Sequence, residues 1–168
     1  MEYLLASGYS SGTSVTFTGF PTTGNSIKIF VAGHTNRSST DSQCWIRING
    51  DASTNYSGFR FRQYGTIDFS YNTLSGGEQY SWVLPGSNAS NSSLQSGATF
   101  FIPNYRNATM RKLVSISSGA NMSASNNNFL SMESCIGLDS TNAITSMTLG
   151  SQTGDTLYLY YWIYVVAD

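Results

Sequence analysis

The amino-acid sequence predicts an all-β protein, in which two antiparallel sheets pack as a β-sandwich of jelly-roll type. Apolar and polar residues alternate over many short segments, turn-forming residues separate these segments, and no helical period is sustained. Ser, Thr, Asn and Gly are frequent, and short polar side chains compete with a helical backbone for hydrogen bonds. About eight to ten short strands, spaced roughly 10 to 15 residues apart, fit such a sandwich.

The composition predicts one folded domain over residues 1–168. Aromatic residues make up 14% of the chain and charged residues only 10%. Because disordered chains are poor in aromatic residues, we expect this chain to fold. A chain of this length can bury roughly 70% of its unfolded surface without a disulfide or a metal. A surface with few charges suits a subunit of an assembly.

The charge and hydropathy patterns favour neither nucleic acid nor a membrane as a partner. Eight Lys and Arg residues face nine Asp and Glu residues, and no basic cluster exceeds the pair Arg111 and Lys112. No apolar run approaches the roughly 18 residues of a membrane span. The segment that starts at Met1 lacks the basic and apolar regions of a signal peptide, so we expect a protein made in the cytoplasm.

The first half of the chain contains several alternating segments. The faces that we expect to be buried are Val15 and Phe17; Ile27, Ile29, Val31 and Gly33; Cys44, Ile46 and Ile48; and Phe59 and Phe61. Arg60 and Arg62 alternate with the last pair, which predicts a strand with a charged, wet face. Asn49 and Gly50 predict a tight hairpin turn, because both residues tolerate a positive φ.

The second half alternates between predicted strands and loops. We expect strands at 98–102, 110–117, 129–138 and 143–149, and either a short strand or an aromatic anchor at 80–84. Segments 72–77, 85–97 and 119–128 are rich in turn and loop residues. Long irregular segments inside a domain are usually functional, so 85–97 and 119–128 are candidate contact loops.

The last predicted strand, residues 156–166, is apolar on both faces. One face carries Leu157, Leu159, Tyr161, Ile163 and Val165, and the other carries Tyr158, Tyr160, Trp162, Tyr164 and Val166. Burying four such rings, at roughly 150 Å² or more each, represents on the order of 15 kcal/mol as an upper limit. Either another subunit or a loop of the same chain covers these rings, or the Tyr hydroxyls make the face amphipathic. We expect Tyr158, Tyr160, Trp162 and Tyr164 to form a subunit interface.

No pattern of residues predicts a catalytic, metal or cofactor site, so we do not expect an enzyme. His34 is the only histidine, with no Asp or Cys beside it in the sequence, and the nine acidic residues are scattered. Cys44 and Cys135 with one histidine cannot form a zinc site, and we expect both thiols to be reduced, with a disulfide as the alternative. Trp45, Tyr80 and Trp82 are candidates for stacking on a glycan.

Several short segments carry a resemblance to a known group of proteins. They are Leu4-Leu5-Ala6-Ser7-Gly8, Ser14-Val15-Thr16-Phe17-Thr18-Gly19, residues 27–33, Ile46-Arg47-Ile48-Asn49-Gly50-Asp51 with Asn55-Tyr56, Ile102-Pro103-Asn104-Tyr105 with Arg111-Lys112, and Ala143-Ile144-Thr145-Ser146-Met147-Thr148-Leu149. Together they resemble small structural proteins of tailed bacteriophages, notably those of cyanobacteria and marine bacteria. This group includes virion decoration (cement) proteins and the tip modules of head or tail fibres.

The resemblance implies a jelly-roll-like sandwich, often trimeric, attached to a phage particle. We therefore expect a capsid decoration protein on the outer capsid surface, which packs on the major capsid protein and on copies of itself as a homotrimer. The loops 85–97 and 119–128 would contact the shell. The alternative is a tail- or head-fibre tip module that binds host-surface glycan.

Overall fold

The computed structural model describes residues 1–38, 41–64, 68–76, 79–86, 96–121 and 129–167. Twelve β-strands and no helix make up the regular structure of this part of the chain. The strands are β1 (Glu2–Gly12), β2 (Ser14–Thr18), β3 (Ser26–Thr35), β4 (Asp41–Ile48), β5 (Tyr56–Tyr64), β6 (Asp68–Gly76), β7 (Gln79–Pro85), β8 (Ser96–Ile102), β9 (Lys112–Asn121), β10 (Phe129–Leu138), β11 (Ser146–Ser151) and β12 (Leu157–Val166).

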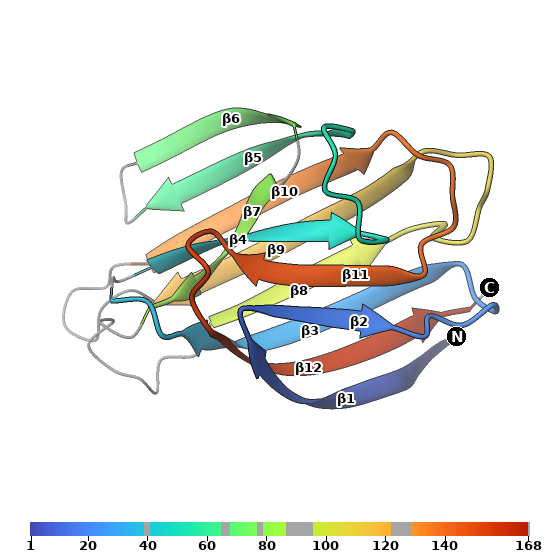
Figure 1. The fold of residues 1–168 in the computed structure, drawn as a ribbon, viewed down its shortest axis with the longest axis horizontal. Helices are drawn as coiled ribbons and strands as arrows, with labels where there is room; N and C mark the ends of the chain where they lie inside the picture. Colours follow the sequence, from blue (N-terminus) through green and yellow to red (C-terminus); the bar gives the residue numbers. More distant parts are fainter. Residues whose placement is uncertain (39–40, 65–67, 77–78, 87–95, 122–128, 168) are drawn as a thin grey trace.

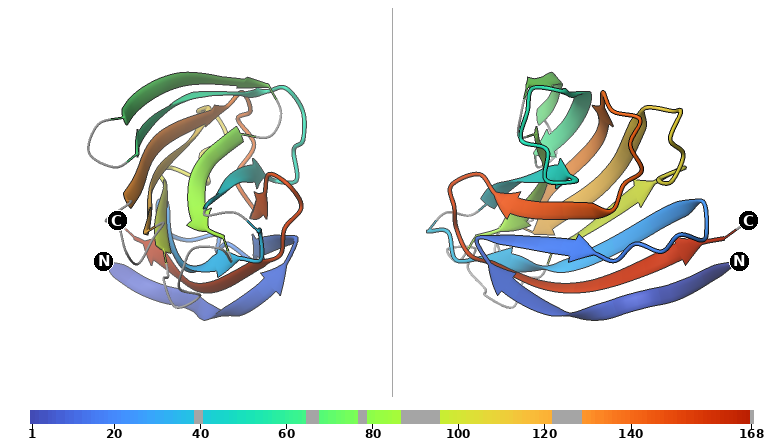
Figure 2. Two further views of the ribbon diagram at one scale, coloured as in Figure 1. Left: turned by 90° about the vertical axis from the view of Figure 1, so that its left-hand side faces the viewer. Right: turned by 45° about the vertical axis from the view of Figure 1, so that its right-hand side comes forward.

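The strands form two antiparallel sheets of unequal size. The large sheet has eight strands in the order β1-β12-β3-β8-β9-β10-β5-β6, and the small sheet has four in the order β2-β11-β4-β7. The large sheet curls around the small one, which lies against its inner face (Figures 1 and 2). The predicted all-β, two-sheet sandwich is therefore confirmed, whereas its jelly-roll subtype stays a prediction.

The hydrophobic core lies between the two sheets. Alternate residues of the facing strands point into it, and the largest fully buried side chains include Trp82, Tyr56, Tyr105 and Phe100. The predicted inward faces of β2, β3 and β4 are confirmed, because Val15, Phe17 and the isoleucines at 27, 29, 46 and 48 are all buried. Period-two patterning thus predicted the core of these strands correctly.

The alternating pattern of β5 has the opposite orientation to the one predicted. Phe59 and Phe61 point to the outer face of the large sheet and are 44% and 40% exposed. Arg60 and Arg62 point inward instead, where the Arg60 guanidinium donates a hydrogen bond to Gln43 at 3.1 Å and Arg62 lies 3.6 Å from the Asp41 carboxylate. Polar partners on β4 allow the two arginines to face inward.

Two turn and loop predictions also need correction. Asn49 and Gly50 do form a turn with positive φ angles of 52° and 70°. However, they do not form a hairpin, because β4 lies in the small sheet and β5 in the large one. Residues 72–76, expected in a loop, belong to β6, which pairs with β5.

Candidate functional site: the outer face of the large sheet

The two faces of β12 lie in different environments. Leu157, Leu159, Ile163 and Val165 are buried in the core between the sheets. Tyr160 and Trp162 point away from it and are 48% and 39% exposed, and Tyr158 and Tyr164 are half-buried. Neighbouring strands therefore shield this row of rings only in part. The predicted interface residues lie together on the surface.

Residues of β1 and β3 extend this row into a continuous surface, which we call the aromatic band. It consists of Tyr9, Phe30, Tyr158, Tyr160, Trp162 and Tyr164. The rings of Tyr9 and Tyr160 lie 5.1 Å apart, those of Phe30 and Tyr164 lie 5.7 Å apart, and Phe30 pairs with Trp162 in the ladder. Such contacts order the rings while leaving their outer surfaces in water.

The ends of the aromatic band carry its polar groups. At one end Lys28 forms an ion pair with Glu2 at 3.1 Å, beside a hollow of about 540 Å³ lined by Phe30, Trp162 and Tyr164. At the other end the His34 imidazole stacks on the ring of Tyr158, with 4.9 Å between the ring centres. Because the two charges at the Lys28 end neutralise each other, the band has little net charge.

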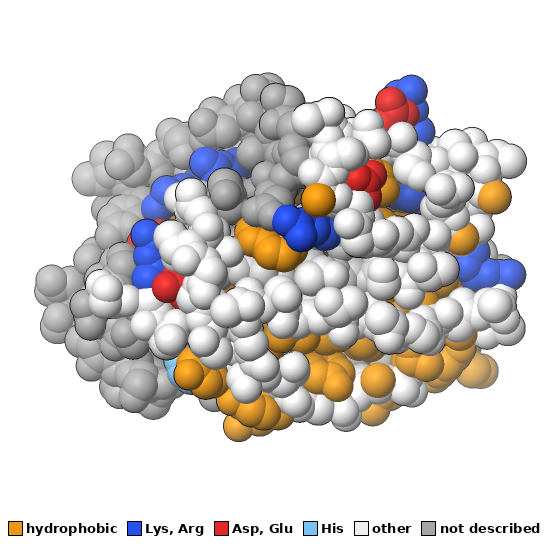
Figure 3. Space-filling view, in the orientation of Figure 1, with side chains coloured by type: hydrophobic (Ala, Val, Ile, Leu, Met, Phe, Trp, Pro, Cys, Tyr) orange, Lys and Arg blue, Asp and Glu red, His pale blue; other side chains and the backbone are white. Residues whose placement is uncertain are grey.

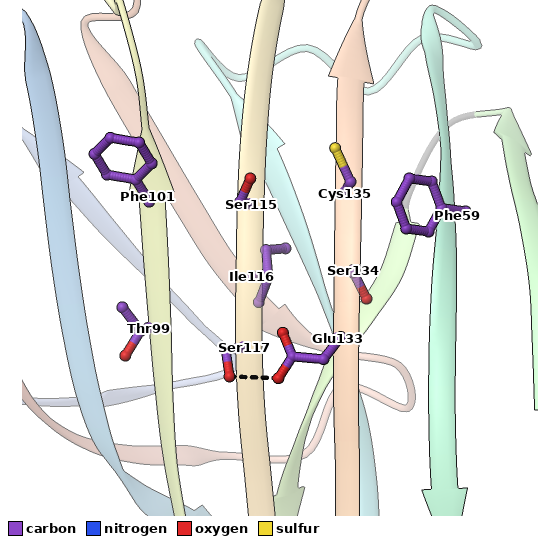
Figure 4. A pocket seen from close by; sticks show the side chains of 9 residues that line it. All are labelled: Phe59, Thr99, Phe101, Ser115, Ile116, Ser117, Glu133, Ser134 and Cys135. Atoms are coloured by element: carbon purple, nitrogen blue, oxygen red, sulfur yellow. Dashed lines mark hydrogen bonds between the residues drawn. The ribbon is translucent and has the colours of Figure 1, made fainter. Parts of the chain in front are cut away.

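The same outer face contains a second feature, which we call the trough, over β8, β9, β10 and β5. Phe101 and Phe59 stand on its two sides, and Ser115 and Cys135 lie between them (Figure 4). The trough has a volume of about 400 Å³. Since Phe101, Ser115, Cys135 and Phe59 are neighbours in one row across four adjacent strands, the rings stand roughly 14 Å apart at their backbones.

The floor of the trough contains hydroxyl groups and one carboxylate. Thr99, Ser115 and Ser117 contribute the hydroxyls, and the Ser117 hydroxyl donates a 2.6 Å hydrogen bond to the Glu133 carboxylate (Figure 4). Burial raises the pKa of the Cys135 thiol, which keeps it protonated at neutral pH. Two rings above hydroxyls and a carboxylate could hold a small hydroxylated molecule.

The residues proposed for glycan stacking are not placed for that role. Trp82 is fully buried, and its ring packs edge-on against Phe100, so it is a core residue. Trp45 is only 8% exposed; its indole N–H donates to the Ser151 carbonyl at 2.8 Å, and the Arg47 guanidinium lies 4.6 Å from its ring centre. The side chain of Tyr80 lies outside the described residues.

The opposite face of the molecule, which carries the small sheet, is mostly polar. In Figure 3 most of the described surface on this face is white, a small hydrophobic patch lies near the centre beside basic side chains, and more hydrophobic side chains gather along the lower edge, where β1 and β12 lie in Figure 1. Thr16 and Thr148 share a hydrogen bond of 3.0 Å between neighbouring strands there. The contrast locates the exposed apolar surface on the large sheet and its β1 edge.

The described residues also bear on the expectations for the two cysteines, a metal site and a membrane span. Cys44 and Cys135 are free thiols, as expected, and Cys44 is fully buried. Within the described residues, no three His, Cys, Asp or Glu side chains lie close enough to hold a metal ion together. In the same part of the chain there is no helix with the length and hydropathy needed to cross a membrane. The proposed contact loops 85–97 and 119–128 lie largely outside the described residues.

Comparisons with known proteins add no identification. No protein-family model matches the chain, and no curated protein matches it. A functional proposal for this protein therefore depends on the geometry of the outer face and on the resemblance described above.

Sequence reasoning identified four residues of the aromatic band and missed the rest of the outer face. It assigned no strand to the segment of β1, where Ser and Gly interrupt the apolar residues, and so it missed Tyr9. It also placed Phe59 on the buried side of β5. The sequence did permit the observed orientation of β5, because Arg60 and Arg62 have side chains long enough to reach acidic or amide partners inside a sandwich.

Proposed function

We propose that this chain is a structural subunit of a tailed-bacteriophage particle, a decoration protein on the outer surface of the capsid. The observation that carries the proposal is the exposed aromatic band on β1, β12 and β3. Four of its six rings are 37% to 52% exposed, and a contiguous exposed apolar surface is typical of an interaction site. Tyr and Trp are also the residues that protein interfaces prefer. The bacteriophage part of the proposal rests on the resemblance of the sequence.

In this proposal the aromatic band packs against the major capsid protein or a neighbouring copy, and the protein is a homotrimer on the shell. The near absence of net charge on the band supports contact with a protein surface over contact with a polyanion. No catalytic step or cofactor is part of the proposed function.

The strand pairing supports the jelly-roll subtype that the resemblance implies. When the hairpins β5–β6 and β9–β10 are set aside, β1 pairs with β12, β2 with β11, β3 with β8, and β4 with β7. The first strand thus pairs with the last and the second with the second last, as in a ribbon folded back on itself. We propose a jelly roll whose large sheet is extended by two inserted hairpins.

Binding to capsid shells tests the main proposal. Shells assembled from the major capsid protein of the same phage are mixed with the wild-type chain, with Trp162→Ser, or with Phe61→Ser, and bound protein is measured after sedimentation. Phe61 is 40% exposed, so it matches Trp162 in exposure but lies outside the band. We expect Trp162→Ser to weaken binding at least tenfold and Phe61→Ser to leave it unchanged. Absence of wild-type binding, or equal loss in both variants, would refute the proposal.

A second candidate function, a fibre-tip module that binds host-surface glycan, is favoured by the trough. The Phe ring on either side of the trough could stack on a sugar, while Ser117 and Glu133 could hydrogen-bond to sugar hydroxyls. An array of bacterial surface glycans tests this candidate with Phe101→Ala and, as a control, Tyr160→Ala. Binding that Phe101→Ala abolishes and Tyr160→Ala retains would support the glycan function. An array on which the wild-type chain binds nothing would exclude it.

A further inference from the structure

The outer edge of β1 is an open edge of the large sheet. β1 is the first strand in the sheet order and pairs on one side with β12, and no other described strand pairs with it on the opposite side. It is eleven residues long, contains no Lys or Pro, and has one bulge, between Leu4 and Ala6. Proteins usually protect long edge strands with charges, prolines or covering segments, because an open edge can pair with another strand.

The ladder shows which backbone groups of β1 point outward. Met1 and Ala167 exchange two hydrogen bonds, in which the Met1 amine donates to the Ala167 carbonyl at 3.1 Å and the Ala167 N–H donates to the Met1 carbonyl at 2.8 Å. Antiparallel ladders alternate between hydrogen-bonded and non-hydrogen-bonded pairs. Because Ala167 belongs to a hydrogen-bonded pair, the odd-numbered residues of β12 form the hydrogen bonds to β1. Their partners include Ala6, Gly8, Ser10 and Gly12. The N–H and C=O groups of Ser7, Tyr9 and Ser11 therefore point away from β12.

These three residues define a segment that can pair with itself. Residues 6–12 follow the bulge in uninterrupted register, and Tyr9 lies at their centre. When two such segments run antiparallel with Tyr9 opposite Tyr9, the outward groups of Ser7 meet those of Ser11 in the other copy. The only charge on β1 is that of Glu2, and the two copies of Glu2 would lie at opposite ends of the pairing.

We propose that β1 pairs with β1 of a second copy of this chain, around a two-fold axis at Tyr9. An axis perpendicular to the sheet continues the large sheet across both subunits and keeps their outer faces on the same side. The rings of Tyr160 and Tyr9 then meet those of the second copy in one row, so the two aromatic bands become one surface. The inference deepens the proposed function by naming the partner at the β1 edge, and it can link two subunits whether or not each belongs to a trimer.

Cysteine cross-linking of the full chain tests the pairing. In a Cys135→Ser background, Tyr9→Cys places two thiols on opposed residues about 5.5 Å apart at Cα, within the range that a disulfide spans. Leu113→Cys is the control, because Leu113 is similarly exposed on β9, far from β1. We expect mild oxidation to form covalent dimer at least tenfold faster with Tyr9→Cys. Equal rates, or no dimer with Tyr9→Cys, would overturn the pairing.

A proline substitution tests the role of the outward amides. Ser7→Pro removes an N–H that does not bond to β12, whereas Ser7→Ala keeps it, and edge strands tolerate proline at such positions. Combined with Tyr9→Cys, Ser7→Pro should abolish the cross-link and Ser7→Ala should retain it, while circular dichroism shows both folded. Retention of the cross-link by a folded Ser7→Pro variant would overturn the proposal. If that variant does not fold, the comparison of Tyr9→Cys with Leu113→Cys decides alone. Shell binding, measured separately with Trp162→Ser, tests the proposed function independently of this result.

Discussion

At the scale of single residues, Tyr56 shows how one side chain connects the two sheets. It begins β5 in the large sheet, and its hydroxyl accepts a 2.8 Å hydrogen bond from the Ile48 N–H at the end of β4. The same hydroxyl donates to the Asp51 carbonyl at 2.9 Å. Tyr56 therefore fixes the connection 49–55, through which the chain passes from the small sheet to the large one.

We predict that Tyr56→Phe lowers the free energy of unfolding by about 1 to 3 kcal/mol, because one buried and one partly buried hydrogen bond are lost. Burial raises the pKa of Tyr56, so the folded state favours the neutral phenol. This contribution is present below the unfolded tyrosine pKa of about 10 and is lost as the pH rises through the higher folded value. Urea unfolding at neutral and alkaline pH measures both effects. A difference between wild type and variant that persists above the folded pKa would contradict the pH assignment.

Asn49 is a second residue whose role the sequence shows only in part. Its positive φ was predicted from the Asn-Gly pair. Its side chain, however, also accepts hydrogen bonds from the Thr145 and Ser146 N–H groups and donates one to the Ala143 carbonyl. Local sequence predicts a turn, but these partners lie about a hundred positions later in the chain, where no local pattern could reveal them.

At the scale of elements, the two faces of β12 should respond very differently to truncation. Leu159→Ala removes a fully buried side chain and should lower the free energy of unfolding by about 2 to 5 kcal/mol. Tyr160→Ala, one position later on the exposed face, should cost about 1 kcal/mol, mostly the contact of its ring with Tyr9. Urea denaturation of both variants measures the difference. Equal costs would mean that the aromatic band contributes to the fold of one subunit as much as the core does.

The strands that the sequence predicted well are those with one buried and one polar face. Strands β2 and β10 have the predicted bounds, since apolar alternation and turn residues mark both of their ends. β1 was missed, and residues 72–76 of β6 were assigned to a loop, because edge strands have less apolar surface to bury and hence a weaker pattern. In β5 the period was correct and the face was wrong, because alternation alone does not say which side meets the core when one side has arginines and the other phenylalanines.

At the scale of the whole molecule, Cys44 reports on the stability of the entire sandwich. It lies in β4, at the interior of the small sheet, and is fully buried. Burial also raises the pKa of its thiol far above neutrality, so that the reactive thiolate is scarce in the folded protein. Cys135, half-buried on the outer face, offers an internal comparison.

We predict that a thiol-alkylating reagent modifies Cys135 in the folded protein, whereas Cys44 reacts only through global unfolding. The rate at Cys44 should rise with urea with the slope of whole-protein unfolding, because the two sheets share one core. Mass spectrometry of the alkylated peptides measures both rates. Comparable rates at the two thiols, or a Cys44 rate that urea leaves unchanged, would show that the small sheet opens independently.

The pairing of Glu2 with Val166 has a consequence for how this protein is made. On the ribosome, β1 remains without its neighbour until β12 has been translated, and all the other strands of the structure lie between the two in the sequence. The large sheet can therefore be completed only after β12 has emerged, and ordering so long an intervening segment makes that step slow. During the delay the apolar start of β1 is available to other nascent chains, so expression at low temperature or with a chaperone should favour soluble protein.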